Sequence, residues 1–267
     1  MSGESQPSPP PPGVTPPPRI EVTRLPIDPV DLDGLLAYVV AAARDESARR
    51  TVGYLNVHVA NTAATDEGVK RYLRERCDLV YCDGRGVGWG ARLQGLPEPP
   101  RMTAADWLPR LLGALRDASL RTFVVAGREG VVDQALSRIA NDPEIGAGPL
   151  GEIEAHHGYL GTEPTGPLTD AVLRRIEAYG PQVVLVGMGT PTQERWTLAN
   201  RDRIAAPVVW PLGATFDYFA GEQARGPEWL RNAGHEWAAR LVADPARLWR
   251  RYVLGNPQFL WRAWRGR

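Results

Sequence analysis

Residues 183–196 read VVLVGMGTPTQERW, an apolar run followed by glycines and then by a helix-like segment. Four consecutive aliphatic residues are typical of a strand that is buried on both faces of a sheet. The chain repeats this arrangement, with apolar runs over 51–59, 79–82, 122–126 and 208–212 and a weaker one near Ile153. Amphipathic patterns between the runs predict helices over 31–44, 67–76, 103–115, 131–140, 168–179 and 191–204. This alternation predicts an α/β fold with a mostly parallel sheet covered by helices on both faces.

The segments after the predicted strands should hold the site, because parallel α/β sheets bind ligands beyond the carboxyl ends of their strands. Glycines and polar side chains gather in these segments, which we expect to be loops over 56–61, 82–89, 126–130, 187–194 and 213–221. Glycines let a ligand approach the backbone closely, and helix N-termini favour anions. The composition of these segments therefore indicates a site for a phosphorylated or sugar ligand.

Asp83 is the first candidate catalytic residue, since it follows the predicted strand 79–82 and precedes a glycine-rich segment. A carboxylate at a strand end, partly removed from water and directed into a cleft, can act as a general base. Gly84 and the glycines after it would let a sugar approach this carboxylate. Asp217, which stands among aromatic residues, is the second candidate. For both aspartates a structural role in a turn or loop remains open.

Gly187 and Gly189, which follow the strand around 183–186, also resemble the start of a dinucleotide-binding loop. This alternative would make the protein a nicotinamide-dependent oxidoreductase. The third glycine of that fingerprint is replaced by Thr192, which weakens the interpretation. Both glycines stay candidate ligand-binding residues.

Thr190, Pro191 and Gln193 have a local explanation as a helix start, with a cap residue, an N1 proline and the glutamine of a capping box. A role for Gln193 in ligand binding explains the pattern about equally well. The local explanation does not account for Glu194, which is therefore also a candidate for ligand binding.

The chain as a whole carries no net charge, with 31 basic and 31 acidic residues among 267, so the total charge points to no particular partner. It has no apolar run of about 18 residues that could span a bilayer, and no signal-peptide pattern, which predicts a cytoplasmic protein. Cys77 and Cys82 are too few for a disulfide scaffold. His58, His156 and His157 lack the spacing of metal ligands, so we expect neither a metal nor another cofactor.

The two ends of the chain differ from its middle in composition. Residues 1–18 contain eight prolines, which predicts a disordered leader over 1–20. Residues 225–267 hold nine arginines and five of the nine tryptophans. We therefore expect three parts: the leader, an α/β domain over 21–224 and a basic, tryptophan-rich appendage over 225–267.

The appendage should contain an amphipathic helix that begins at Asp244-Pro245 and ends at Gly255. At 100° per residue the apolar residues fall on one face and the arginines on the other: Leu248, Trp249, Tyr252 and Val253 against Arg247, Arg250 and Arg251. Tryptophan opposite arginine is typical of a helix that lies in a membrane interface. A helix packed on its own domain and a site for single-stranded nucleic acid are the alternatives. A small-ligand α/β cleft ahead of the helix favours a membrane partner over nucleic acid.

Several motifs follow one another in an order found in a known family: Asp83-Gly-x-Gly86-Val87, Val186-Gly-x-Gly189-x-Pro191-x-Gln193-Glu194, Gly213-Ala-x-Phe216-Asp217, Glu236-Trp-x-x-Arg240-Leu, Pro245-x-Arg247-Leu-x-Arg250-Arg251-Tyr and Asn256-Pro-x-Phe259. Through them residues 50–260 resemble the WecG/TagA/CpsF family. Its members are bacterial inverting glycosyltransferases of teichoic acid, enterobacterial common antigen and exopolysaccharide assembly. The proline-rich leader lies outside the resemblance.

The resemblance implies a Rossmann-like α/β domain whose C-terminal appendage brings the enzyme to the inner face of the bacterial cell membrane. It implies transfer of a sugar from a UDP-sugar donor to a sugar on a polyprenyl diphosphate acceptor. The transferred sugar would be N-acetylmannosamine or a related hexose. The alternative from another functional class is a non-catalytic module that binds a membrane or nucleic acid. Both the transferase and such a module could form a homo-oligomer.

The resemblance also implies roles for individual residues. Asp83 would act as the base without an obligatory metal, and Asn56 and Gln193 would line the pocket. Arginines of the appendage would contact the diphosphate of the acceptor, namely Arg225, Arg240, Arg247, Arg250 and Arg251. Many members have threonine where this chain has Tyr54, so the wall of the pocket is expected to differ here.

Overall fold

The computed structural model describes residues 17–141, 150–222 and 245–266, together with Pro11 and Leu241. Its centre is a six-stranded sheet built from the predicted strands: β3 (Arg50–Leu55), β4 (Leu79–Cys82), β5 (Thr122–Ala126), β6 (Ile153–His156), β7 (Val183–Gly187) and β8 (Val208–Pro211). The strands lie in the order β4-β3-β8-β7-β5-β6, and every neighbouring pair is parallel. The predicted Rossmann-like α/β fold is therefore confirmed.

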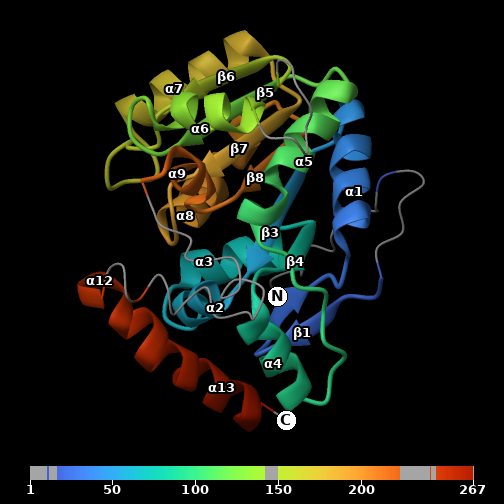
Figure 1. Ribbon diagram of the computed structural model, residues 1–267, viewed down its shortest axis with the longest axis vertical. Helices are drawn as coiled ribbons and strands as arrows, with labels where there is room; N and C mark the ends of the chain where they lie inside the picture. The colour runs from blue at the N-terminus through green and yellow to red at the C-terminus, as the bar shows by residue number, and fades with distance from the viewer. Residues whose placement is uncertain (1–10, 12–16, 142–149, 223–240, 242–244, 267) are drawn as a thin grey trace, which may run out of the picture.

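Helices cover both faces of this sheet (Figure 1). One face packs against α1 (Leu32–Arg44), α5 (Ala104–Asp117), α6 (Val131–Ala140) and α9 (Thr215–Ala220), and the other against α7 (Pro167–Tyr179) and α8 (Thr192–Asn200). Along β7, Val183 and Leu185 belong to the first core, whereas Val184 and Val186 belong to the second. This alternation is the period of two that a strand buried on both faces must have.

The topology opens a crevice at the carboxyl ends of the central strands. After β4, at one edge of the sheet, the chain crosses to β5, which lies beyond β3, β8 and β7. The segments that follow β3 and β4 therefore face those that follow β7 and β8. Such reversals of strand order are where open α/β sheets bind their ligands.

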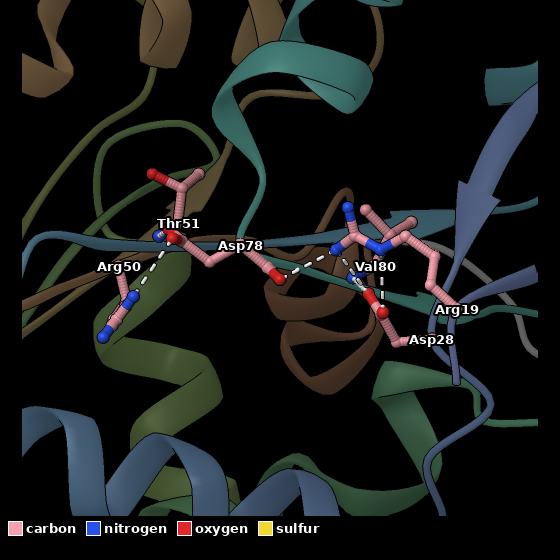
Figure 2. Close-up of polar contacts among 6 residues, drawn as sticks. All are labelled: Arg19, Asp28, Arg50, Thr51, Asp78 and Val80. Carbon is pink, nitrogen blue, oxygen red and sulfur yellow. Dashed lines mark hydrogen bonds and ion pairs between the residues drawn. The ribbon is translucent and has the colours of Figure 1, made fainter. Parts of the chain in front are cut away.

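A short hairpin that the sequence did not predict precedes the sheet. Strands β1 (Ile20–Val22) and β2 (Leu25–Ile27) pair antiparallel, and the next residue, Asp28, is buried. Asp28 accepts two 2.8 Å hydrogen bonds from Arg19 and one of 2.7 Å from the backbone N–H of Val80 in β4 (Figure 2). The hairpin is thus fixed to the edge of the sheet. Arg19 and Ile20 belong to the folded part of the chain, although the sequence assigned them to the leader.

Asp78 fixes the same edge from the other side (Figure 2). Its carboxylate accepts a 2.8 Å hydrogen bond from the backbone N–H of Thr51 and pairs with Arg50 at 3.3 Å. Its backbone oxygen accepts a 2.8 Å bond from Arg19. These contacts link the N-terminal segment, the start of β3 and the residue before β4. They pair backbone groups that would otherwise stay unpaired at this edge of the sheet.

Three helices occupy stretches that we expected to be strand or loop. The apolar run 51–59 is divided into β3 and α2 (Val57–Ala63), because Asn56 caps the helix by accepting from the backbone N–H of Val59 at 2.9 Å. The glycine-rich segment after Asp83 forms α4 (Arg85–Leu93), and α9 replaces the last loop. Glycines misled the prediction for α4, where they serve packing. A Cβ on Gly86 would lie 2.4 Å from Val57, and one on Gly90 would lie 2.7 Å from Phe259.

Two further helices end in irregular turns. Helix α3 (Glu67–Arg71) continues as the π-helical turn η1 (Tyr72–Arg76), and α8 continues as the 3₁₀ turn η2 (Arg201–Arg203). Together these pairs cover residues 67–76 and 192–203, where helices were predicted over 67–76 and 191–204.

The C-terminal residues form one helical arm: α12 (Pro245–Trp249), the π-helical turn η3 (Arg250–Leu254) and α13 (Gly255–Arg265). Figure 1 shows this arm, in red, along α2 and α4. The prediction that Gly255 ends the helix is wrong, because its φ of −66° and ψ of −41° are helical. Asn61 of α2 donates a 2.8 Å hydrogen bond to the carbonyl of Gly255, and a Cβ there would lie 2.9 Å from the Asn61 amide nitrogen. The glycine allows this close approach.

Some predictions fall outside the described residues. They concern most of the proline-rich leader, the domain boundary at 224–225, Arg225, Arg240 and the side chain of Arg247. Within the described ranges, no helix is long and apolar enough to cross a membrane.

Candidate active site

A cleft of about 630 Å³ lies at the carboxyl ends of β3, β4, β7 and β8. The C-terminal arm closes one side of it. Its lining includes Tyr54, Asn56, His58, Tyr81, Asp83, Thr103, Gly189, Thr190, Gly213, Tyr218, Leu248, Arg251 and Tyr252. This is the position that the strand pattern predicted for a ligand.

Asp83 and Asn56 meet in this cleft at the ends of the two neighbouring strands β4 and β3. The backbone N–H of Asp83 donates to the carbonyl of Leu55 at 2.9 Å, which continues the ladder between the strands and fixes the half-buried carboxylate. Asn56 donates from Nδ2 to Oδ2 of Asp83, also at 2.9 Å. Because its Oδ1 already caps α2, the orientation of the Asn56 amide is set by the fold. Sequence reasoning placed both residues in the pocket, and the structure brings them into direct contact.

Gly84 separates the carboxylate of Asp83 from the start of α4. Its φ of +84° lies in the region that favours glycine, and no atom of the described residues lies within 4 Å of the position of a Cβ. A ligand can therefore approach both Asp83 and the first backbone N–H groups of α4. The partial positive charge at this helix N-terminus favours a negatively charged ligand group.

A second, smaller cavity of about 150 Å³ adjoins the cleft. The two share Asn56, His58, Asp83, Thr103, Arg251 and Tyr252. The smaller cavity adds residues from α4 and its flanks and from the C-terminal arm: Gly84, Arg85, Gly86, Trp89, Arg101, Asn256 and Leu260. Asp83 and Asn56 thus stand between two spaces that could each hold one of two reactants.

A buried polar cluster forms the wall of the cleft behind Tyr54. Gln193 donates 2.9 Å hydrogen bonds to the hydroxyl of Tyr54 and to Oε1 of Glu194, and it accepts from the backbone N–H of Gly213 at 3.0 Å. Thr190 donates to the same Glu194 oxygen at 2.8 Å. Gln193 is therefore no capping-box residue, and that local interpretation of its position is wrong. Gln193 and Glu194 support the wall instead of lining the cleft.

Burial determines the protonation of this wall. It raises the pKa of Tyr54, so the phenol keeps its proton. It also raises the pKa of Glu194, although the hydrogen bonds from Gln193 and Thr190 oppose this shift. Within the described part of the chain no group donates to Oε2 of Glu194, so this buried oxygen lacks a hydrogen-bond partner.

His58, from the first turn of α2, faces both cavities. Burial, followed by the positive charge of Arg251, lowers the pKa of His58 to about 4, against a smaller opposing effect of a hydrogen bond to the backbone of Thr190. At neutral pH His58 is therefore an uncharged imidazole next to a guanidinium.

Among the candidate appendage arginines whose side chains the structure describes, Arg251 lines the site and Arg250 does not. Arg250 is exposed and lies over the ring of Trp249, with its guanidinium carbon 5.4 Å from the ring centroid. The expected separation of arginines from aromatic residues fails, because Arg251 and Tyr252 line the cleft together. The π-helical turn η3 accounts for this, since it changes the angular step of 100° on which the separation was calculated.

Two other candidates lie outside the lining of the cavities. Gly187 packs inside the fold, where a Cβ would lie 2.7 Å from that of Ala126 and 2.8 Å from the carbonyl oxygen of Gly213. This packing explains the glycine without a dinucleotide. Asp217 is half-buried on α9, whereas its neighbour Tyr218 reaches the cleft.

Sequence reasoning missed several residues of the site. Arg85, Arg101, Thr103 and Asn256 line the smaller cavity or both cavities. Arg85 stands in the glycine-rich segment and Asn256 in the last motif of the appendage, but neither had a chemical signature. Arg101 gave no signal, and Thr103 indicated only the start of a helix, because only the folded chain brings both residues to Asp83. In the described ranges, no group of three or more His, Cys, Asp or Glu side chains is arranged to hold a metal ion.

Comparison with known proteins gives consistent matches. The model of a family described as the glycosyl transferase WecG/TagA/CpsF family matches residues 20–267. Curated relatives from Staphylococcus aureus strains NCTC 8325, COL and MRSA252 carry the name N-acetylglucosaminyldiphosphoundecaprenol N-acetyl-beta-D-mannosaminyltransferase. Each is 25% identical to this chain over 196 residues, which cover 73% of this chain and 72% of the relative.

Proposed function

The chain belongs to the WecG/TagA/CpsF family of glycosyl transferases, and we propose that it moves a hexose from a UDP-sugar to a sugar carried on a polyprenyl diphosphate. The names of the relatives describe an N-acetylmannosaminyl transfer to N-acetylglucosaminyldiphosphoundecaprenol. We take N-acetylmannosamine or a related hexose as the transferred sugar, with inversion at its anomeric carbon. The product would enter a cell-surface polysaccharide or a teichoic-acid-type glycan.

The position of Asp83 and Asn56 between two cavities is the observation that carries this proposal. The larger cleft, at the ends of β3, β4, β7 and β8, suits the donor nucleotide sugar. The smaller cavity, between α4 and the C-terminal arm, suits the acceptor sugar. A carboxylate at the junction can reach a hydroxyl on one side while the anomeric carbon lies on the other.

The chemistry follows from this placement. The acceptor hydroxyl oxygen bonds to the anomeric carbon as the bond between that carbon and the UDP oxygen breaks. The hydroxyl proton passes to the carboxylate of Asp83, and UDP leaves with the bonding electron pair. Asn56 keeps the carboxylate turned toward the junction through its 2.9 Å hydrogen bond. A general base placed in this way typically contributes about 10²–10⁴-fold to the rate.

Negative charge on the two diphosphates needs compensation. Arg251 lines both cavities, and Arg85 and Arg101 line the smaller one. The N-terminus of α4 adds backbone N–H groups beside Gly84. These groups can stabilise the leaving UDP and the lipid diphosphate, and so we propose that the reaction needs no metal ion.

The C-terminal arm gives such an enzyme access to a lipid substrate. Five of the eight large exposed apolar residues among those described lie there: Trp249, Val253, Leu254, Trp261 and Trp264. Residues 245–266 hold five arginines and no acidic residue. Exposed tryptophans among arginines, with no acidic residue, favour an anionic membrane interface even without separate faces. We propose that the protein binds peripherally to the inner face of the cell membrane through this arm.

The test combines the full chain with a short-chain N-acetylglucosaminyl diphosphate lipid and a panel of UDP-hexoses that includes UDP-N-acetylmannosamine. UDP release, the mass of the product and the configuration of its new linkage by NMR are measured with and without EDTA. We expect acceptor-dependent UDP release, one added hexose, an inverted linkage and unchanged turnover in EDTA.

Two results would contradict the proposal. UDP release that does not depend on the acceptor would indicate a hydrolase, and no product from any donor would exclude the transfer reaction. Full loss of activity in EDTA, restored by Mg²⁺, would overturn only the metal-free part of the mechanism.

A further inference from the structure

We propose that a basic pocket outside the active site binds a phosphate group, presented by an anionic lipid headgroup. The pocket has a volume of about 230 Å³ and shares no lining residue with the two cavities at Asp83. It lies between the β1–β2 turn, α2, the α3–η1 helix and α13. Its lining consists of Thr23, Arg24, Leu25, Ala60, Ala63, Ala64, Lys70, Arg74 and Arg262.

The lining has the composition of an anion site. Three segments that are far apart in the sequence contribute four cations, Arg24, Lys70 with Arg74, and Arg262, and no carboxylate among the described residues lines the space. Thr23 and Leu25 complete the lining together with three alanines, two of α2 and Ala64 directly after it, and these small side chains leave the volume open. Arginine and lysine at fixed positions around an open volume match the charge and the several acceptor oxygens of a phosphate.

These charges are largely uncompensated within the described part of the chain. Lys70 pairs with Glu67 at 3.2 Å, but no carboxylate there pairs with Arg24, Arg74 or Arg262. Arg262 is half-buried and donates a hydrogen bond to the side-chain oxygen of Asn61, and burial lowers its pKa without an opposing carboxylate. A bound anion would supply the missing negative charge.

The backbone at Arg24 indicates that this arginine serves something other than local folding. Thr23 and Arg24 connect β1 to β2 with φ values of +52° and +63°. A two-residue hairpin of this kind favours Asn-Gly, because glycine adopts positive φ without strain. Arginine in this position is costly for the turn, and it places a guanidinium in the basic pocket.

The position of the pocket indicates that the bound phosphate group belongs to a lipid headgroup and not to free phosphate. Arg262 belongs to the same turn of α13 as Trp261 and Trp264, which are each 55% exposed. The guanidinium carbon of Arg265 lies 4.5 Å from the ring centroid of Trp261. Tryptophan rings settle at the headgroup level of a bilayer. A membrane that takes up these rings would bring its phosphates to the adjacent flank of α13, where Arg262 lies.

The test measures binding of the full chain to phosphatidylglycerol-containing vesicles and to pure phosphatidylcholine vesicles, without donor or acceptor. Arg74→Ala should weaken binding to the anionic vesicles about fivefold. Arg71→Ala is the matched control, because Arg71 lies one turn away and is already paired with Glu75 at 3.2 Å. It should change binding less than twofold.

Arg24→Gly separates binding from stability. Glycine relieves the positive φ, so the melting temperature should stay the same or rise, while binding to anionic vesicles falls about fivefold. A structural role for Arg24 would give the opposite pattern. Equal vesicle binding by the wild type, Arg24→Gly and Arg74→Ala would overturn the proposal.

Inorganic phosphate distinguishes the two sources of the ligand. Millimolar phosphate should have little effect on the melting temperature of the wild type. If it raises that temperature in the wild type but not in Arg74→Ala, while vesicle binding is equal in both, the pocket binds free phosphate and the lipid assignment is wrong. Because every measurement is of binding, failure of the sugar-transfer proposal would leave this result unaffected.

Discussion

Asn56 holds Asp83 and caps a helix with the same amide group. Its Nδ2 donates to Oδ2 of Asp83 at 2.9 Å, and its Oδ1 accepts from the backbone N–H of Val59 at 2.9 Å. The cap decides which end of the amide faces the carboxylate, so Asp83 always meets a donor. The start of α2 and the orientation of the proposed base therefore depend on one residue.

Asp83→Asn should lower turnover by about 10²–10⁴-fold and leave the fold and donor affinity nearly intact. The carboxamide oxygen can still accept from Asn56, but the group cannot take up the proton of the acceptor. Turnover, melting temperature and UDP-sugar affinity are measured together. Asp217→Asn is the control, since Asp217 lies on α9 outside the lining of both cavities. If that variant loses the turnover and Asp83→Asn keeps it, Asp217 is the base.

Two substitutions of Asn56 should separate its roles. Serine can cap α2 but cannot donate an amide N–H to Asp83, so Asn56→Ser should keep stability and lose at least tenfold in turnover. Asn56→Ala should lose the same turnover and, in addition, about 1 kcal/mol of unfolding free energy. Chemical denaturation and steady-state rates check this pair. Equal stability of the two variants would show that the cap contributes little.

The sheet was predictable because strands that are buried on both faces consist of consecutive apolar residues. Val183–Val186 and Phe123–Ala126 are uninterrupted apolar runs, and the strand that contains each agrees within one residue with its predicted bounds. The position of Asp83 followed from the same pattern, since a carboxylate directly after such a run must lie at the carboxyl edge. What the pattern could not provide was the hydrogen bond from Asn56, which requires the register of β3 against β4.

The glycines show where sequence reasoning failed. Gly187 and Gly255 were interpreted as a ligand loop and a helix stop, yet each makes room for a backbone or side chain that is remote in the sequence. Gln193 was open to a capping role, but its partners Tyr54 and Gly213 come from β3 and the segment after β8. Such contacts depend on tertiary neighbours, which local periodicity does not encode.

Asp28→Ala should be one of the most destabilising single substitutions, at about 3 kcal/mol. It removes the acceptor of two hydrogen bonds from Arg19 and leaves the buried N–H of Val80 without a partner. Asp33→Ala is the control, because Asp33 pairs with Arg110 at an exposed site and should cost less than about 0.5 kcal/mol. Urea denaturation compares them. A similar loss of unfolding free energy in both variants would mean that the buried network around Asp28 stabilises the fold no more than an exposed ion pair does.

Glu194→Gln should gain stability relative to the wild type as the pH rises. Burial raises the pKa of Glu194, so the folded state binds its proton more tightly than the unfolded state does. The stability that this proton contributes is complete below the ordinary carboxyl pKa and is lost as the pH rises through the raised value. Glutamine is neutral at every pH and escapes this loss. Glu194→Ala should be less stable by about 2 kcal/mol, since Thr190 and Gln193 lose an acceptor.

Unfolding free energies of these variants at several pH values provide the check for Glu194. A constant difference between Glu194→Gln and the wild type from pH 4 to pH 8 would mean that Glu194 ionises as freely in the folded state as in the unfolded one.

His58 should make the protein less stable in mild acid. Burial and the charge of Arg251 lower the pKa of His58 to about 4, whereas an unfolded histidine titrates near 6.5. Between these values the unfolded state binds more protons, so stability falls as the pH drops from about 6.5 and levels off near 4. After allowance for solvent screening of the half-buried ring, the loss should be roughly 2 kcal/mol. In His58→Gln this part of the acid sensitivity should disappear.

NMR titration of the His58 ring tests the cause directly. Arg251→Gln removes the neighbouring positive charge, so the pKa of His58 should rise toward its ordinary value while desolvation keeps it below that value. UDP bound in the cleft would bring negative charge close to Arg251. The pKa of His58, measured on the same ring, should then also rise. An unchanged titration in Arg251→Gln would show that burial alone holds His58 neutral. An unchanged titration with saturating UDP would place the diphosphate away from Arg251.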